Sequence, residues 1–207
     1  MTRKSTLAIF AITASALALA ACSQAVAPAD NAAMADNMAI DDGTMTDDAM
    51  PADNVGATSQ SVGFTGGDGA SLGSVTVTEN AGGVTMAIRA TGMPAGVHGI
   101  HLHEKGLCDG PKFESAGAHW NPGLKQHGRD NPAGAHAGDL ANLTVAADGS
   151  ASTSIPVAGA MMASGNMMLA DADGTVLVVH AKADDYRTDP SGDSGDRIAC
   201  AVVAKGR

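Results

Sequence analysis

The sequence is poor in aromatic side chains: three Phe, one Trp and one Tyr make up 2% of its 207 residues. Proteins that bind single-stranded nucleic acid stack the bases on aromatic side chains, which this chain hardly offers. Basic residues are also few, with 12 Lys and Arg against 22 Asp and Glu and a net charge of −10. An acidic chain without a basic stripe lacks the electrostatic attraction that nucleic acids require. We therefore expect no nucleic-acid partner.

Long apolar runs are absent except at the N-terminus, where Arg3 and Lys4 precede the uncharged stretch from Ser5 to Ala21. A run of this length behind positive charges is typical of a signal sequence and is short for a membrane span. The run ends in Leu19-Ala20-Ala21-Cys22, and small residues before a lone cysteine resemble the bacterial lipobox. We expect residues 1–21 to be a lipoprotein signal peptide. An ordinary cleaved signal and a single-pass anchor are the alternatives.

Lipid on Cys22 would hold the protein at a membrane surface, in the periplasm or cell envelope. Ser23 follows the cysteine and is not acidic, which favours the outer membrane. Residues 22–58 are built from Ala, Asp, Asn and Met, with seven Asp and no Lys or Arg. Such a segment cannot bury enough apolar surface to order itself, so we expect a disordered tether. Its methionines could bind copper(I), but a spacer is the simpler interpretation.

Residues 59–207 form the expected folded domain, and no part of them shows a long amphipathic helical period. The 26 glycines fit a turn-rich β protein. Short segments with alternating or β-branched residues lie between Gly- and Asp-rich turns. The expected strands are residues 71–78, 83–90, 97–104, 139–145, 151–157, 175–181 and 198–204. This pattern predicts an all-β fold, an antiparallel sandwich or barrel.

Two long stretches interrupt the strands, from Lys105 to Gly138 and from Ala183 to Arg197. Long connections without secondary structure in a compact domain are usually functional. Six of the seven histidines lie in the 39 residues from His98 to His136. His101 and His103 are two apart in an expected strand, which places both rings on one face. A pair on one face with four more nearby indicates a metal site.

The remaining histidines divide by ligand chemistry. His119, His127 and His136 lie on the first long loop, and Asp139 follows three residues later. Three imidazoles and a carboxylate suit a tetrahedral, structural Zn²⁺. His180 ends an apolar run and can complete an imidazole-rich copper site with His101 and His103.

Two cysteines remain in the domain, Cys108 and Cys200. Export to an oxidising compartment favours a disulfide between them, and two unpaired thiols are the alternative. The bond would hold the start of the first long loop against the last strand.

Together these motifs resemble the copper/zinc superoxide dismutase family over residues 59–207. The segment His98-Gly99-Ile100-His101-Leu102-His103-Glu104 resembles the first family signature, and the segment from Gly192 to Cys200 resembles the second. The segments 115–122, 136–140 and 178–185 lie between them in the family's order. The resemblance implies a Greek-key antiparallel β-barrel or flattened sandwich, with one copper and one zinc per subunit.

The resemblance also implies a role for each matched residue. His101, His103, His119 and His180 match the copper ligands, and His119, His127, His136 and Asp139 match the zinc ligands, so His119 bridges the ions. Asp184 matches the carboxylate that binds a ligand ring of each site, Cys108 and Cys200 match the disulfide, and Arg197 matches the arginine beside copper. His98 matches a structural position.

The implied activity is the disproportionation of superoxide to oxygen and hydrogen peroxide, with His119 and Arg197 as catalytic residues. Because the substrate is an anion and the domain is acidic, local positive charge must attract it. Arg197 fits this role, and Lys182, Lys125 or Arg187 could assist. A non-catalytic copper/zinc-binding protein of the same fold is the alternative. The resemblance leaves the oligomeric state open, with a homodimer as one option.

Overall fold

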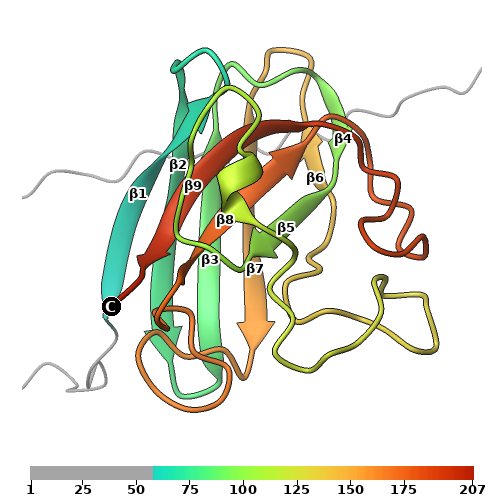
Figure 1. The fold of residues 1–207 in the computed structure, drawn as a ribbon. Helices are drawn as coiled ribbons and strands as arrows, with labels where there is room; N and C mark the ends of the chain where they lie inside the picture. Colours follow the sequence, from blue (N-terminus) through green and yellow to red (C-terminus); the bar gives the residue numbers. More distant parts are fainter. Residues whose placement is uncertain (1–57) are drawn as a thin grey trace, which may run out of the picture. The chain divides into compact units, whose positions relative to one another are not determined.

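The computed structural model describes residues 58–207. Nine strands and one short 3-10 helix make up its regular structure (Figure 1). The elements are β1 Ser59–Gly66, β2 Ser71–Asn80, β3 Gly83–Ala90, β4 Gly96–His98, β5 Ile100–His103, η1 Glu114–Ala116, β6 Leu143–Val145, β7 Ala151–Ala158, β8 Gly174–His180 and β9 Arg197–Lys205.

Seven of the strands form one antiparallel sheet in the order β5-β8-β9-β1-β2-β3-β7, while β4 and β6 form a separate ribbon. The sheet curls into a half-barrel (Figure 1). Because β3 pairs with β7 and β5 with β8, strands far apart in the chain become neighbours, as in a Greek key. The expected all-β antiparallel fold is confirmed.

The expected strand from residue 97 to 104 is divided at Gly99 into β4 and β5. The backbone N–H of Gly99 donates to the carbonyl of Lys182, and a Cβ on Gly99 would lie 2.9 Å from the Cβ of Ser194. This close approach leaves no room for a side chain at residue 99, so only glycine fits there. The strand pairing is interrupted at this residue. The expected strand from 139 to 145 is shorter than expected and begins at Leu143.

The strand β1 was not expected from the sequence. Most of its side chains are exposed, and only Phe64 and Gly66 are buried. Its eight residues lack the β-branched richness that marks the other strands, so pairing with β2 and β9 creates it.

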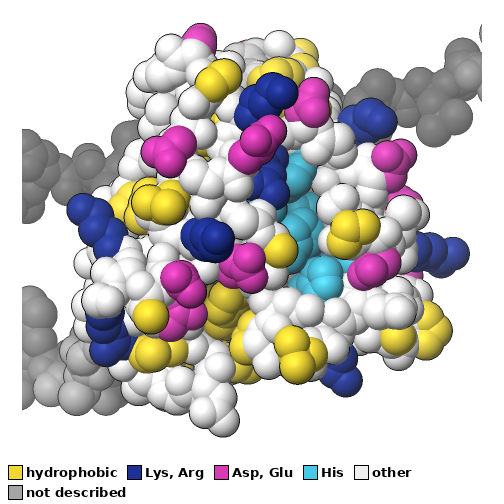
Figure 2. Space-filling model, viewed as in Figure 1, with side chains coloured by type: hydrophobic (Ala, Val, Ile, Leu, Met, Phe, Trp, Pro, Cys, Tyr) yellow, Lys and Arg dark blue, Asp and Glu magenta, His cyan; other side chains and the backbone are white. Residues whose placement is uncertain are grey.

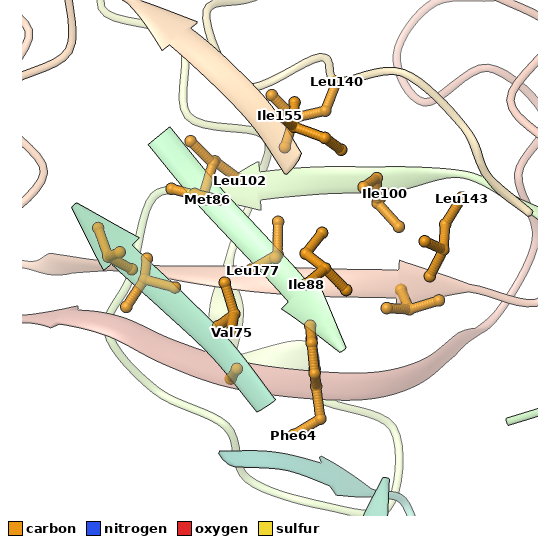
Figure 3. Close-up of a cluster of buried hydrophobic side chains, with 14 of the residues drawn as sticks. Phe64, Val75, Met86, Ile88, Ile100, Leu102, Leu140, Leu143, Ile155 and Leu177 are labelled. Carbon is orange, nitrogen blue, oxygen red and sulfur yellow. The ribbon is translucent and has the colours of Figure 1, made fainter. Parts of the chain in front are cut away.

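The main core fills the concave side of the sheet (Figure 3). Ile100 and Leu102 of β5 point into this core, together with side chains such as Phe64 and Leu177. A second cluster packs on the opposite face of β8. It consists of Phe113, Ala116, Val176, Val178 and Cys200. With both faces covered, all seven residues of β8 are buried.

The long segment between β5 and β6 lies along the outer edge of β5. Its backbone donates and accepts at this edge: Leu102 N–H donates to the Gly138 carbonyl, and Trp120 N–H donates to the Leu102 carbonyl. Isolated bridges join His103 with His119 and His101 with Asp139. The segment is therefore held against the strand that carries the histidine pair.

Residues 1–21, Cys22 and nearly all of the segment 22–58 lie outside the described residues. Within residues 58–207, no helix has the length and apolar character needed to cross a membrane.

Candidate metal centre

Strand alternation places the first two histidines. Ile100 and Leu102 point into the core, so His101 and His103 lie together on the opposite face of β5. His180 ends β8, which pairs with β5. The bridge between His103 and His119 adds a fourth ring from the long loop. All four side chains are buried.

These four histidines each offer a ring nitrogen, and the four nitrogens lie within 4.8 Å of one another. Among the described residues, the buried side-chain nitrogens without a hydrogen-bond partner include His101 Nδ1, His103 Nε2, His119 Nε2 and His180 Nε2. One unsatisfied buried polar atom costs about 1–3 kcal/mol, so four at one point require a common partner. A metal ion bound by four imidazoles fits this donor set.

The opposite nitrogen of three of these rings is held by a hydrogen bond. His101 Nε2 donates to Asp184 Oδ2 at 2.9 Å, His103 Nδ1 donates to the Gly117 carbonyl at 3.0 Å, and His180 Nδ1 donates to the Gly195 carbonyl at 3.1 Å. Each bond fixes the proton on the far side of its ring. The nitrogen that faces the centre therefore has a free lone pair, as a metal ligand needs.

A second group of ligand atoms surrounds the carboxylate of Asp139. His119 Nδ1, His127 Nδ1 and His136 Nδ1 lie 2.9, 3.0 and 3.1 Å from its Oδ1 atom. His119 Nδ1 and His136 Nδ1 are themselves 3.3 Å apart. Three ring nitrogens converging on one carboxylate oxygen fit a small cation better than a hydrogen-bond network, and N₃O is a donor set that Zn²⁺ takes.

His101 lies close to both groups, but its contacts assign it to the first. The ligand atoms of His101, His119, His127 and Asp139 also lie within 4.8 Å of one another, so His101 borders both groups. Its Nε2 is already bonded to Asp184, and its Nδ1 is one of the four unpaired nitrogens of the first group. The contact of His136 with Asp139 therefore makes His136 the better third imidazole of the second group.

His119 is common to both groups. Its Nε2 faces the first group without a partner, and its Nδ1 lies beside Asp139. Its ring stacks on that of His101 with centroids 4.0 Å apart. One imidazole thus connects the two candidate ion positions.

Asp184 connects the groups from behind. Its Oδ2 accepts from His101 Nε2, and its Oδ1 accepts from His127 Nε2 at 3.0 Å. Gly192 lies so close that a Cβ there would collide with the Asp184 carboxylate. Its φ of +67° is also unfavourable for other residues, so glycine is required beside this carboxylate.

Burial and charge separate the pKa values of the buried groups. Burial lowers the pKa of His119 to about 4 and that of His180 to about 3. Burial opposes protonation of His127 as well, but the carboxylates of Asp139, 3.0 Å from Nδ1, and of Asp184, bonded to Nε2, raise its pKa to about 9. Burial would raise the pKa of both carboxyls, yet their histidine donors hold each pKa well below its usual range. Both carboxyls are therefore ionised, and their negative charge favours a cation in the second group.

Arg197 lies beside the first group. Its Nη1 and Nη2 donate to the carbonyls of Phe113 and Gly117, both at 2.6 Å, and burial lowers its pKa. It lines a cavity of about 680 Å³ with Lys112 and Glu114. Figure 2 shows histidine side chains in a depression of the surface with a basic side chain beside them.

Lys112 is a functional candidate that the sequence alone did not reveal. The only sequence signal for Lys112 is its place four residues after Cys108. The disulfide of Cys108 brings this segment to β9, which begins with Arg197. The lysines named from the sequence do not line this cavity. Lys182 Nζ lies 3.9 Å from Asp193 Oδ1. Lys125 is exposed, and its backbone N–H donates to the side chain of Asn121. Arg187 Nη2 lies 3.8 Å from Asp130 Oδ2, so this arginine is paired with a carboxylate.

The expected disulfide between Cys108 and Cys200 is confirmed, with their Cα atoms 5.7 Å apart. It ties the segment that carries Phe113 and Gly117 to β9, and so supports the two carbonyls that hold Arg197. His98 is buried outside both groups, with its ring nitrogens 2.8 Å from the carbonyl oxygens of His180 and Pro94.

The family model for "Copper/zinc superoxide dismutase (SODC)" matches residues 71–203 of this chain. The "Superoxide dismutase [Cu-Zn]" of Caulobacter vibrioides is 45% identical over 140 residues, which cover 66% of this chain and 80% of that protein. The "Superoxide dismutase-like protein YojM" of Bacillus subtilis is 43% identical over 123 residues, which cover 58% of this chain and 63% of that protein.

Solved structures give the same result. A superoxide dismutase-like protein from Bacillus subtilis aligns with a TM-score of 0.67 and 38% identity, covering 69% of this chain and 97% of that one. The Cu/Zn superoxide dismutase from Brucella abortus aligns with a TM-score of 0.57 and 29% identity, covering 70% of this chain and 99% of that one.

Proposed function

Since the chain belongs to the copper/zinc superoxide dismutase family, we infer that it disproportionates superoxide to oxygen and hydrogen peroxide. The observation that carries this function is the group of four buried imidazole nitrogens without partners, joined through His119 to the group around Asp139. A zinc site that only stabilises the fold would need the second group alone.

The geometry above supports the two ligand sets. Copper would be held by His101, His103, His119 and His180, and zinc by His119, His127, His136 and Asp139. Copper supplies one-electron chemistry by alternating between its Cu(II) and Cu(I) states. Zinc has no redox chemistry and would hold the shared ring of His119 in place.

The protein side of the reaction is proton delivery and anion binding. Two superoxide anions and two protons give one oxygen and one hydrogen peroxide. His119 Nε2 faces the first group. While this atom is not bound to copper it would take up a proton and pass it to the second superoxide, with the other proton coming from solvent, and Nδ1 would keep the ring oriented. The guanidinium of Arg197 binds the incoming anion at the cavity wall.

Direct measurement of superoxide decay tests this function. The full chain loaded with copper and zinc should accelerate the decay in a pulse-radiolysis experiment, and the metal-free chain should not. A loaded protein that binds both ions without accelerating the decay would instead be a non-catalytic copper/zinc-binding protein.

We further propose that the protein is exported and anchored by lipid on Cys22, in the periplasm or at the cell envelope. The N-terminal motif and the Cys108–Cys200 disulfide support this location, because disulfides persist in oxidising compartments. Association as a homodimer is compatible with it and is tested by sedimentation.

Replacing the anchor cysteine tests the location. Cys22→Ala removes the lipid acceptor, so the enzyme should move from the membrane fraction to the soluble fraction with unchanged specific activity. Cell fractionation with an activity assay measures this. Retention of the variant in membranes would contradict the lipobox interpretation.

A further inference from the structure

Tyr186 is the single tyrosine of the sequence and lies two residues after Asp184. It is half-buried at the point where the segment 183–196 meets the loop that carries the zinc ligands. The proposed mechanism assigns it no task, yet three of its polar atoms are bonded to three different partners.

The first two bonds come from the backbone of Tyr186. Its N–H donates to Asp184 Oδ1 at 2.6 Å, and its carbonyl accepts from the N–H of Asp130 at 3.0 Å. The guanidinium of Arg129 lies 5.6 Å from the ring centroid. Tyr186 therefore contacts Asp130 on the loop that carries the zinc ligands, and it also contacts the carboxylate of Asp184, two residues before it in the sequence.

The third bond comes from the side chain. The Tyr186 hydroxyl oxygen accepts from the backbone N–H of Asn142 at 2.8 Å. The side chain of Asn142 in turn holds the backbone of Asp184 twice: its Nδ2 donates to the Asp184 carbonyl and its Oδ1 accepts from the Asp184 N–H, both at 2.9 Å. Asn142 lies three residues after Asp139, so this connection bridges the two loops.

Backbone strain indicates that this arrangement is held by its contacts. Tyr186 has a φ of +62°, a left-handed conformation that costs a residue with a Cβ about 1–2 kcal/mol. The carbonyl of Tyr186 also packs so closely on Gly128 that any side chain at position 128 would collide with it. A strained conformation that persists is over-determined by its surroundings and is a signal of function.

We propose that Tyr186 is a positioning residue that fixes Asp184 through Asn142. Asp184 accepts from His101 and from His127, so its position decides which ring nitrogens of these two ligands face the ions. The hydroxyl of Tyr186 thereby supports metal binding in both groups without touching either ion. The proposal rests on the proposed function only for the identity of the ions.

Tyr186→Phe tests the proposal because it keeps the ring and removes only the acceptor of the Asn142 N–H. Loss of partners that orient metal ligands costs roughly 10–100-fold in affinity, and the hydroxyl acts one step further away. We expect zinc affinity to fall roughly tenfold in a chelator competition with the full chain. The visible spectrum of Co²⁺ bound in place of zinc should shift, because the His127 ring is less firmly oriented.

A double-mutant cycle separates positioning from general stability. Asn142→Ala alone should weaken zinc binding at least as much as Tyr186→Phe does. In the Asn142→Ala background, Tyr186→Phe should change the affinity less than about twofold, since the path to Asp184 is already broken. An equal loss in both backgrounds would overturn the proposal.

Arg187→Gln is the matched control. It removes the exposed ion pair with Asp130, which joins the same two loops, and such pairs contribute little. Zinc affinity should stay within about twofold of the wild type. The same result for Tyr186→Phe, with an unchanged Co²⁺ spectrum, would refute the role of Tyr186. These measurements use no superoxide. A chain that binds both ions without dismutating superoxide would therefore contradict the proposed function and leave the role of Tyr186 unaffected.

Discussion

His180 differs from His119 in belonging to one ion group only. Its Nε2 faces the first group, and its Nδ1 is fixed by the carbonyl of Gly195. It makes no contact with Asp139, the carboxylate of the second group. A substitution at this position therefore separates the two ions experimentally.

His180→Ala should abolish turnover while zinc remains bound. Removal of a ligand costs more than removal of a partner behind it, so we expect at least a roughly 100-fold loss of activity. Metal analysis of the purified variant, combined with the superoxide assay, measures both effects. Unchanged activity would refute the assignment of His180 to copper.

Lys112→Gln should slow the reaction by weakening attraction of the anion to the cavity. One charge at a cavity wall changes the association rate roughly twofold at low ionic strength, and added salt should remove the difference. The rate constant measured against salt concentration tests this. Lys205→Gln, at the opposite end of β9 from Arg197, is the control and should have a smaller effect. Equal slopes for both variants would exclude a steering role.

Residue types and spacing predicted the histidines and Asp139 as metal ligands, because ligand chemistry is a property of the side chain itself. Lys112, Asn142 and Tyr186 were not predicted as functional residues. Each gains its place through contacts between segments far apart in the chain, and apart from the nearness of Lys112 to Cys108 nothing in the neighbouring sequence marks these residues. The cavity wall and the support of Asp184 therefore emerged only from the tertiary structure.

At the scale of elements, the segment from Cys108 to Gly117 serves three purposes. It covers the outer face of β8 with Phe113 and Ala116, and its carbonyls hold Arg197. The Gly117 carbonyl also accepts from His103 Nδ1, so one loop orients both a copper ligand and the arginine. Its attachment to β9 by the disulfide makes all three depend on one covalent bond.

Replacement of both cysteines by serine should lower the free energy of unfolding by roughly 4–5 kcal/mol, given the 92-residue separation of the two positions. Activity should fall as well, because Arg197 loses its fixed partners. Urea unfolding and the superoxide assay measure the two effects. Chemical reduction of the wild type should reproduce both, and unchanged stability in either case would contradict the structural role.

Strand prediction succeeded where the sequence pattern is local. The strand Gly83–Ala90 has the expected bounds because its alternation is strong and a turn precedes it. The division at Gly99 depends on Lys182 and Ser194, which come more than eighty residues later. Similarly, β1 depends on pairing with β2 and β9, so its own residues do not reveal it.

At the scale of the whole molecule, buried histidines make the stability of the metal-free protein depend on pH in two directions. His119 and His180 have lowered pKa values, so protonation opposes the folded state as pH falls below their unfolded value near 6.5. His127 has a pKa raised to about 9, so its stabilising proton is fully effective below pH 6.5 and is lost as pH rises toward 9.

The metal-free protein should therefore be most stable near pH 6.5. The contribution of His127, about 3 kcal/mol, should disappear between pH 6.5 and 9, and stability should also fall toward pH 3. Denaturant unfolding at a series of pH values measures this. Zinc-loaded protein is the control and should lose the decline on the alkaline side. Stability that rises steadily from pH 6.5 to 9 would contradict the role of His127.

The backbone bonds along the outer edge of β5 also protect the molecule from self-association. An open strand edge is a template on which another chain can add a strand and begin a fibril. The bonds at Leu102 occupy this edge, and at the other end of the sheet Pro156 of β7 has no N–H to donate. The covering segment also carries His119, His127, His136 and Asp139, so bound ions would hold it in place and would protect solubility as well as catalysis.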